Sequence, residues 1–264
     1  MNASEIPDYV TKGDGDITIF LLHGAYGSKD YWRNEITYFV SQGYRVVAWD
    51  APGYGQSLLP EDYSIELLAR ECVGLIEHLG SKRNIIVGHS MGGLIAPKVY
   101  EYRPDLIHAM VISATVASMG HMSAEFQETF IRERIAPLDH GVRFAKVAGP
   151  LVSTMMYSGN VCADRDLIVD CASKTPEPAF RAAIAAIASY KGAGVIEKLD
   201  VPTLFIAGRH DPIGTPDLMR EMSARVTGSE FVCIENAGHY AWAEQADDFN
   251  QQLLAFLARN NLKA

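Results

Sequence analysis

The chain has few cysteines, and they are not arranged for a disulfide framework or a metal centre. Cys72, Cys162, Cys171 and Cys233 are the four cysteines among 264 residues. They form no CxxC pair and no metal-type spacing with histidine. We therefore expect reduced, mostly buried thiols, no bound metal and a cytoplasmic location.

The chain also lacks an excess of positive charge and a long apolar run. It has 23 Lys and Arg against 32 Asp and Glu, a formal net charge of −9. This charge argues against a nucleic-acid partner, because such a partner requires a basic face. No apolar run reaches the roughly 18 residues of a membrane span. Residues 1–16 are polar and acidic, unlike a secretory signal. A small molecule is the expected partner.

Short apolar runs alternate with helical segments along most of the chain. Hydrophobic residues make up 48% of it, enough for a sizeable core. Strands are predicted at 17–22, 45–49, 84–87, 109–113, 203–207 and 230–234, and helices at 31–42, 64–79 and 91–102. Alternating strands and helices predict an α/β fold, a mostly parallel sheet with helices on both faces.

This alternation is interrupted between residues 115 and 190. That stretch has no convincing strand, and its helical segments are expected near 123–135, 141–147, 163–172 and 178–189. We interpret residues 1–114 and 191–264 as the core and residues 115–190 as a helical lid (cap), because insertions at strand ends usually shape a binding site. The alternative is a set of extra helices packed on the core.

The segment Gly88-His89-Ser90-Met91-Gly92 matches G-x-S-x-G between a predicted strand and a predicted helix. This context is the one in which the motif forms a sharp turn that presents a nucleophilic serine. Small residues must flank the strained serine, and glycines supply the room. Ser90 is therefore the candidate nucleophile. The alternative is a turn serine that only caps the next helix.

A serine hydroxyl needs a base, and the base needs a carboxylate that fixes its tautomer. His239 follows the last predicted strand, and Asp211 follows the strand before it. The chain order Ser90, Asp211, His239 is the order that this type of fold uses. The alternative for Asp211 is a turn aspartate bonded to its own backbone.

Two backbone N–H groups must face the negative oxygen of a tetrahedral intermediate. One comes from the residue after the nucleophile, Met91, and the other from the loop after an early strand. That loop is His23-Gly24-Ala25-Tyr26-Gly27, so we assign the second N–H to Ala25. The alternative for this loop is an ordinary strand-to-helix turn.

The segments LLHGAYGS, AWDAPGYGQS, GHSMGG, AGRHDP and NAGHYAWAEQADDF together resemble the α/β-hydrolase superfamily over essentially the whole chain. The resemblance implies an eight-stranded, mostly parallel sheet and chemistry without a cofactor. It places Ser90, Asp211 and His239 at the triad positions, and Ala25 and Met91 at the oxyanion positions. More closely, the chain resembles the group of 3-oxoadipate enol-lactonases and ring-cleavage-product hydrolases.

Three functions remain open at this point. The first is hydrolysis of an ester or lactone through an acyl-enzyme on Ser90, the second is C–C bond hydrolysis with the same triad, and the third is ligand binding with slow turnover. The oligomeric state, monomer or homodimer, is also open.

The expected pocket is apolar and adaptable, because the lid is rich in methionine and aromatic residues. The pocket residues that we predict are Tyr26, His121, Met122, Phe126, Met155, Met156 and Tyr240. The lid also offers Met119, Phe130 and Tyr157. One of its cations, Arg132, Arg134, Arg143 and Lys146, could pair with a substrate carboxylate. The alternative is that all four are solvated helix charges.

Overall fold

The computed structural model describes residues 6–159 and 162–264, which form one sheet with helices around it. Within these residues the sheet has seven strands in the order β1-β3-β2-β4-β5-β6-β7. All neighbouring strands are parallel except β1 and β3, which pair antiparallel. The strands are β1 (Tyr9–Lys12), β2 (Ile17–Leu22), β3 (Arg45–Trp49), β4 (Arg83–His89), β5 (Ile107–Ser113), β6 (Thr203–Gly208) and β7 (Glu230–Ile234).

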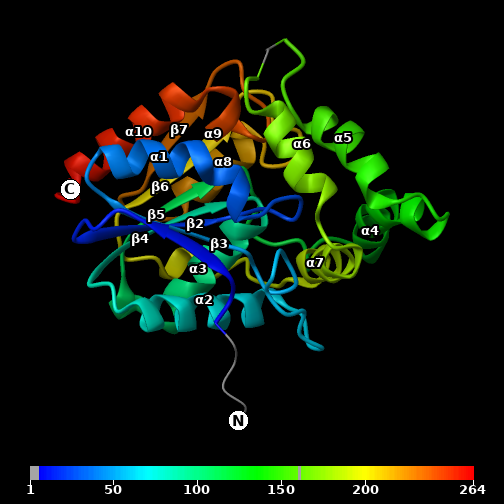
Figure 1. Cartoon of the computed structure of the whole chain (residues 1–264), viewed down its shortest axis with the longest axis horizontal. Coiled ribbons are helices and arrows are strands. Elements are labelled where there is room, and N and C mark those ends of the chain that lie inside the picture. Colours follow the sequence, from blue (N-terminus) through cyan, green and yellow to red (C-terminus); the bar gives the residue numbers. More distant parts are fainter. Residues whose placement is uncertain (1–5, 160–161) are drawn as a thin grey trace.

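Helices cover both faces of this sheet, with α1 and α10 on one face and α2 and α3 on the other (Figure 1). The helices outside the insertion are α1 (Arg33–Ser41), α2 (Ile65–Leu79), α3 (Met91–Tyr102), α8 (Pro216–Ala224), α9 (Ala241–Glu244) and α10 (Ala246–Arg259). Short 3₁₀ helices lie at Lys29–Trp32, Pro104–Leu106 and Ile196–Lys198. The predicted α/β fold class and layer arrangement are confirmed.

Local sequence explains why these elements begin and end where they do. Every residue of β2 and of β6 is buried, as apolar strands covered on both faces require. Helix α2 begins after Ser64, whose side chain accepts a hydrogen bond from the N–H of Leu67, and it ends at Gly80, which adopts φ 61°. These caps fix the length of a helix that packs against α3.

The expected number of eight strands is wrong for the described residues, which contain seven. The strand β1 had not been predicted, since its four residues are too few for a clear alternation. Before it, Pro7 has no N–H to donate to a neighbouring strand, and after it Gly13 turns the chain with φ 77°. Within residues 6–16 the chain therefore supplies one short edge strand.

The helical insertion, which we define as residues 115–190, lies between β5 and β6. Its described helices are α4 (Ala124–Asp139), α5 (Phe144–Met155), α6 (Arg165–Ser173) and α7 (Glu177–Ser189), which gather on one side of the sheet (Figure 1). Their number agrees with the prediction, but α5 runs to Met155 instead of ending near residue 147. It continues through Gly149 and Pro150, residues that usually disfavour a helix interior.

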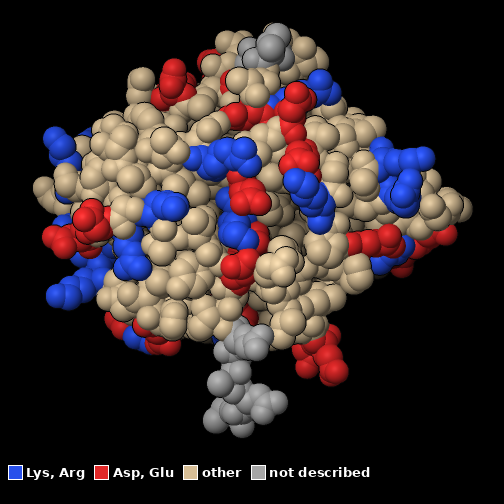
Figure 2. All heavy atoms as spheres, viewed as in Figure 1, with Lys and Arg blue, Asp and Glu red and all other residues tan. Residues whose placement is uncertain are grey.

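The surface carries charges of both signs. On the face shown in Figure 2, Lys and Arg side chains alternate with Asp and Glu, without a continuous basic area. Within the described residues, no helix has the length and apolar composition needed to cross a membrane.

Candidate active site

Ser90 lies at the turn between β4 and α3, in a backbone conformation that non-glycine residues rarely adopt. Its φ and ψ are 54° and −116°. The end of β5 holds this turn, because the N–H of Ser90 donates to the carbonyl of Ser113 at 2.9 Å. In addition, the Thr115 hydroxyl donates to the carbonyl of Ser90 at 2.8 Å. Strain of this kind persists only where surrounding bonds impose it, and it marks functional sites.

The two glycines that flank Ser90 in the motif leave no room for side chains. A Cβ added to Gly88 would lie 2.3 Å from the carbonyl oxygen of Gly92, and one added to Gly92 would lie 2.3 Å from that of Leu22. Both contacts are with backbone atoms, which cannot move aside as a flexible side chain does. The spacing of the motif therefore follows from how closely α3 approaches β2 and β4.

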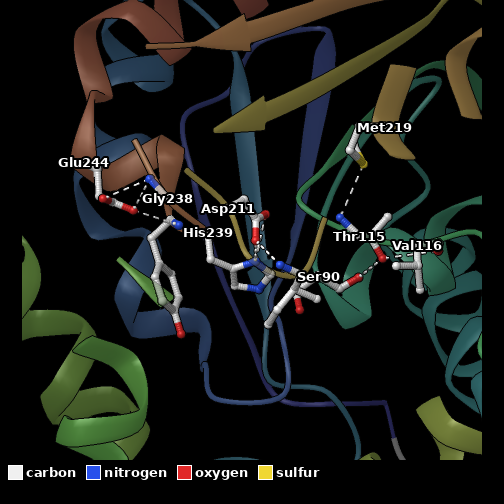
Figure 3. A network of polar contacts seen from close by, with 10 residues as sticks. Ser90, Thr115, Val116, Asp211, Met219, Gly238, His239 and Glu244 are labelled. Carbon is white, nitrogen blue, oxygen red and sulfur yellow. Dashed lines mark hydrogen bonds and ion pairs between the residues drawn. The ribbon is translucent and has the colours of Figure 1, made fainter. Parts of the chain in front are cut away.

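His239 and Asp211 form a buried pair beside Ser90. The Nδ1 of His239 donates to both carboxylate oxygens of Asp211, each at 3.0 Å. The side chains are almost fully buried, and Asp211 Oδ1 also accepts the N–H of Ile213 at 2.8 Å. Figure 3 shows the imidazole between the Asp211 carboxylate and Ser90. Because Nδ1 carries the proton, the Nε2 nitrogen is left as a base.

The loop that carries His239 is braced by Glu244, a residue that the sequence interpretation did not select. The Glu244 carboxylate accepts a hydrogen bond from the N–H of Gly238 at 3.1 Å (Figure 3). It also accepts the N–H of Tyr240 at 3.1 Å and that of Tyr157 at 2.7 Å. Burial raises the pKa of Glu244, and these bonds oppose the rise. A carboxylate five residues after the histidine, inside the apolar run AWAE, was the available signal.

The helical insertion reaches the same loop through its own backbone. The N–H of His239 donates to the carbonyl of Met155 at 2.8 Å, at the end of α5. Two residues later, Tyr157 stacks on His210 with ring centroids 4.1 Å apart. Residues 155–157 therefore touch both the loop of Asp211 and the loop of His239.

The loop after β2 is held by side chains that leave one N–H free. The N–H of Gly24 donates to the Tyr31 hydroxyl at 2.9 Å, and the Tyr54 hydroxyl donates to the carbonyl of Ala25 at 3.0 Å. In the described part of the chain, neither the N–H of Ala25 nor that of Met91 has a protein acceptor. Both residues line the cavity at Ser90, as an oxyanion site would require.

His23 also fixes this loop, and its tautomer follows from its partners. Its Nε2 accepts the N–H of Ala51 at 2.9 Å, so Nδ1 carries the proton and donates to the carbonyl of Gly24 at 2.8 Å. Burial lowers the pKa of His23, which is consistent with a neutral ring. The loop is thereby tied to the end of β3.

His89 precedes Ser90 and packs beside the catalytic pair. It is fully buried, and its ring centroid lies 4.9 Å from that of His239. Burial lowers the pKa of His89 well below the usual value, and the charge of His239 lowers it further. His89 is therefore neutral and packs beside His239 without adding a charge to the site.

Ser90 and His239 line one cavity, in which the space open to the centre of a water-sized sphere is about 40 Å³. The sheet side and the insertion both line it, and most of the lining is apolar. The lining residues are Ala25, Tyr26, Ser90, Met91, Leu94, Ala114, Thr115, Val116, Met119, Phe130, Arg134, Met155, Ile184, Ile187, Ile213 and His239. This composition suits a small, largely apolar ligand.

The predicted pocket residues divide into two groups. Tyr26 and Met155 line the cavity, whereas Met122 and Phe126 do not and are 45% and 48% exposed. His121, Met156 and Tyr240 also lie outside the lining, His121 exposed on the surface and Tyr240 buried against the rings of His89 and His239. These five residues lie outside the lining of this cavity, and a contact of any of them with substrate stays a prediction. Met122 lies just before α4, Phe126 lies in its first turn, and both face solvent. The sequence alone does not show which side of this segment is exposed.

All four cysteines are free. Among the described residues, no group of three or more His, Cys, Asp or Glu side chains is placed to hold a metal ion.

Comparison with known proteins identifies the family and a range of activities. Residues 17–246 match the family model described as "alpha/beta hydrolase fold". The chain is 27% identical over 247 residues to a Pseudomonas syringae protein provisionally named a carbamate hydrolase, covering 91% of this chain and 93% of the relative. It is also 27% identical over 258 residues to a 2-hydroxy-6-oxononadienedioate/2-hydroxy-6-oxononatrienedioate hydrolase from a Pseudomonas species, covering 94% and 90%.

Solved structures with the same fold include an enol-lactonase from Burkholderia xenovorans. The TM-score is 0.84 at 23% identity, and the match covers 95% of this chain and 96% of that one. Other relatives are named as an enol-lactonase and as proline iminopeptidases, and other similar structures are esterases. The relatives thus share hydrolysis but not one substrate.

Proposed function

Because the chain belongs to the α/β-hydrolase fold family, we propose that this hydrolase is a serine hydrolase that cleaves a carboxylic ester or lactone of a small substrate. The observation that carries the proposal is the shared cavity, in which Ser90 lies beside His239 and His239 is bonded to the buried Asp211. Ser90 is the nucleophile in this proposal, His239 the base, and Asp211 the group that orients the base.

The first half of the reaction forms an acyl-enzyme. His239 Nε2 takes the proton from the Ser90 hydroxyl as its oxygen attacks the substrate carbonyl. The N–H groups of Ala25 and Met91 stabilise the negative oxygen, and each such donor contributes on the order of 3 kcal/mol in the transition state. The protonated His239 then donates its proton to the leaving alkoxide, so that the ester bond breaks.

The second half of the reaction releases the acid. His239 removes a proton from a water molecule, which attacks the acyl carbon, and Ser90 leaves with the proton that His239 returns. Asp211 remains ionised throughout and stabilises the imidazolium form of His239. The chain's own residues supply every proton transfer in this sequence.

The helical insertion is the lid in this proposal, and residues 1–114 and 191–264 are the catalytic core. Met119, Phe130, Met155, Ile184 and Ile187 from the insertion supply an apolar wall of the cavity. The insertion therefore selects the substrate, whereas the loops at the ends of the strands perform the reaction.

Hydrolysis of a C–C bond in a ring-cleavage product is the second candidate. It is supported by the relative named as a 2-hydroxy-6-oxononadienedioate/2-hydroxy-6-oxononatrienedioate hydrolase, which is as similar as any relative reported above. The same triad would act, with a stabilised carbanion as the leaving group in place of an alkoxide. A panel of esters, lactones and vinylogous diketones separates the two candidates by their kcat/KM values.

The test of the nucleophile is the intact-protein mass after exposure to a fluorophosphonate. We expect one stoichiometric adduct on the wild type and none on Ser90→Ala or His239→Ala. Ser41→Ala, which changes an exposed serine at the end of α1, serves as the control and should be labelled like the wild type. A well-folded wild type without an adduct would contradict the proposal and favour a ligand-binding protein.

A further inference from the structure

One charged side chain from the insertion faces the cavity at Ser90. Arg134 of α4 is the one Lys or Arg among the described residues that line it, and no Asp or Glu does so. Most of its neighbours there are apolar, including Met119, Phe130 and Ile187. Arg134 is partly buried, so its guanidinium is only partly solvated and is available to an anionic group inside the cavity.

The local contacts of Arg134 orient its guanidinium without neutralising it. One Nη donates to the carbonyl of Phe130 at 3.1 Å, one turn earlier on α4. The guanidinium carbon lies 3.8 Å from the centroid of the Phe130 ring. In the described part of the chain, no carboxylate lies within ion-pair distance of Arg134. Arg181, in contrast, pairs with Asp139.

Tyr26 connects Arg134 to the catalytic end of the cavity. It follows Ala25 directly, it lines the same cavity, and its hydroxyl lies close enough to Arg134 for the guanidinium charge to act on it. Burial raises the pKa of Tyr26 to about 12, whereas the charge of Arg134 acts in the opposite direction. The hydroxyl therefore stays protonated at neutral pH, so it is a donor beside the guanidinium rather than its counter-ion.

We propose that Arg134, with the Tyr26 hydroxyl beside it, binds a carboxylate of the substrate while the scissile carbonyl lies at Ser90. This inference rests on the proposed function and narrows its substrates to esters or lactones that carry a free carboxylate. The planar guanidinium matches a carboxylate with two parallel N–H···O bonds, and both bonds are charge-assisted. The apolar lining between the two ends suits the carbon chain that joins the groups.

Two series of esters test this assignment. In the first the carboxylate is on the acyl side: monoethyl succinate, glutarate and adipate, each against the uncharged ethyl ester of equal length. In the second it is on the alcohol side: O-acetyl derivatives of 3-hydroxypropionate and 4-hydroxybutyrate against their uncharged propyl and butyl counterparts. For each pair we measure the ratio of kcat/KM for the charged ester to that for the neutral ester.

We expect the wild type to favour the charged member of at least one pair by about 10- to 100-fold, the range for hydrogen bonds to a charged group. Arg134→Gln should bring this ratio close to one, chiefly through KM, and Arg134→Lys should retain part of it. The matched control is Arg132→Gln, because Arg132 is exposed on the same helix, outside the cavity lining, and its removal should leave the ratio unchanged. A wild-type ratio of one or less in every pair, or an unchanged ratio in Arg134→Gln, would overturn the assignment.

A failure of the proposed function gives a different result from a failure of this inference. If the wild type cleaves none of the esters and takes no fluorophosphonate label, the nucleophile proposal is wrong. Titration calorimetry with glutarate and adipate then decides the inference: binding to the wild type that Arg134→Gln loses and Arg132→Gln keeps supports the carboxylate site. No binding, or equal binding by all three proteins, overturns it.

Discussion

The cavity has a wall on the sheet side and a wall on the insertion side, and different interactions hold the two in place. On the sheet side, Ser90, Asp211 and His239 are held by directional hydrogen bonds with named partners at 2.8–3.1 Å. On the insertion side, contact is made mainly by apolar side chains such as Met119 and Ile187, with one cation, Arg134. Hydrogen bonds fix angles, whereas apolar packing fixes shape and tolerates exchange. The first wall is therefore suited to one reaction, and the second to a choice of substrates.

The largest effect on activity is expected from replacing Asp211, which lies on the sheet side of the cavity. Asp211→Asn should lower kcat by about 1,000- to 10,000-fold, because an amide in this place no longer secures the tautomer in which Nε2 is the base. Ester hydrolysis under saturating substrate measures the loss. The control is Asp217→Asn, since Asp217 is 87% exposed and lies on α8 away from the site. Equal activity of the two variants would show that Asp211 has no role in the reaction.

A smaller effect on kcat is expected at Glu244, where the insertion contacts the loop of His239. Glu244 accepts N–H groups from the His239 loop and from Tyr157 of the insertion. Glu244→Gln leaves one acceptor oxygen and turns an NH₂ donor toward N–H donors, so the loop should shift and kcat should fall by about 10-fold. The assay is run far below the melting temperature of the variant, so that unfolding does not contribute.

Glu235→Gln is the matched control for Glu244→Gln, because Glu235 is exposed and pairs with Arg209 on the surface. A kcat of Glu244→Gln that equals that of Glu235→Gln would mean that the two walls act independently. A fall confined to Glu244→Gln would mean that the insertion and the His239 loop are mechanically coupled.

The same contrast explains what could be predicted from the sequence. The positions of Ser90, Asp211 and His239 follow from short motifs at strand ends, because a parallel sheet brings these ends together regardless of what lies between them. The strands β2, β3 and β7 and the helix α2 were predicted at their observed bounds or within one residue. Local composition was sufficient for each of these features.

The insertion wall could not be predicted in the same way. Which face of α4 turns inward depends on how α4 packs on α7, a contact between segments more than 35 residues apart. Phe126 and Phe130 are one turn apart on α4, yet Phe126 is exposed and Phe130 lines the cavity. Glu244 was missed for a related reason: its place among apolar residues in AWAE indicates a buried carboxylate, but the sequence does not show which backbone N–H groups it accepts.

Glu35 of α1 is buried close to the boundary between the core and the insertion. Neither carboxylate oxygen reaches a donor of another residue in the described part of the chain. Burial raises the pKa of Glu35 well above 4.5, and the charge of Asp164 in the insertion adds to the rise. Above pH 4.5 the carboxyl of Glu35 keeps its proton in the native state and releases it in the unfolded chain. The free energy of unfolding therefore falls as the pH rises from 4.5 toward the pKa of the folded state.

Glu35→Gln removes this titration and should therefore lose less stability than the wild type as the pH rises from 5 to 8. The quantity to compare is the difference in the free energy of unfolding by urea between the two proteins at each pH, because other groups titrate in both. Glu221→Gln, an exposed change on α8, should follow the wild type at every pH. A difference that stays constant with pH would mean that Glu35 is ionised in the folded protein.

The smallest effect is expected on the outer side of the insertion. Met122 and Phe126 are exposed and lie outside the cavity lining, so Met122→Ser and Phe126→Ser should change the stability by less than about 0.5 kcal/mol. Their kcat/KM values should stay close to that of the wild type, whereas Phe130→Ala should change the relative kcat/KM of the ester panel. If Phe126→Ser altered that selectivity as strongly as Phe130→Ala does, the insertion would have to rearrange when substrate binds, and the wall that substrate meets would differ from the one described above.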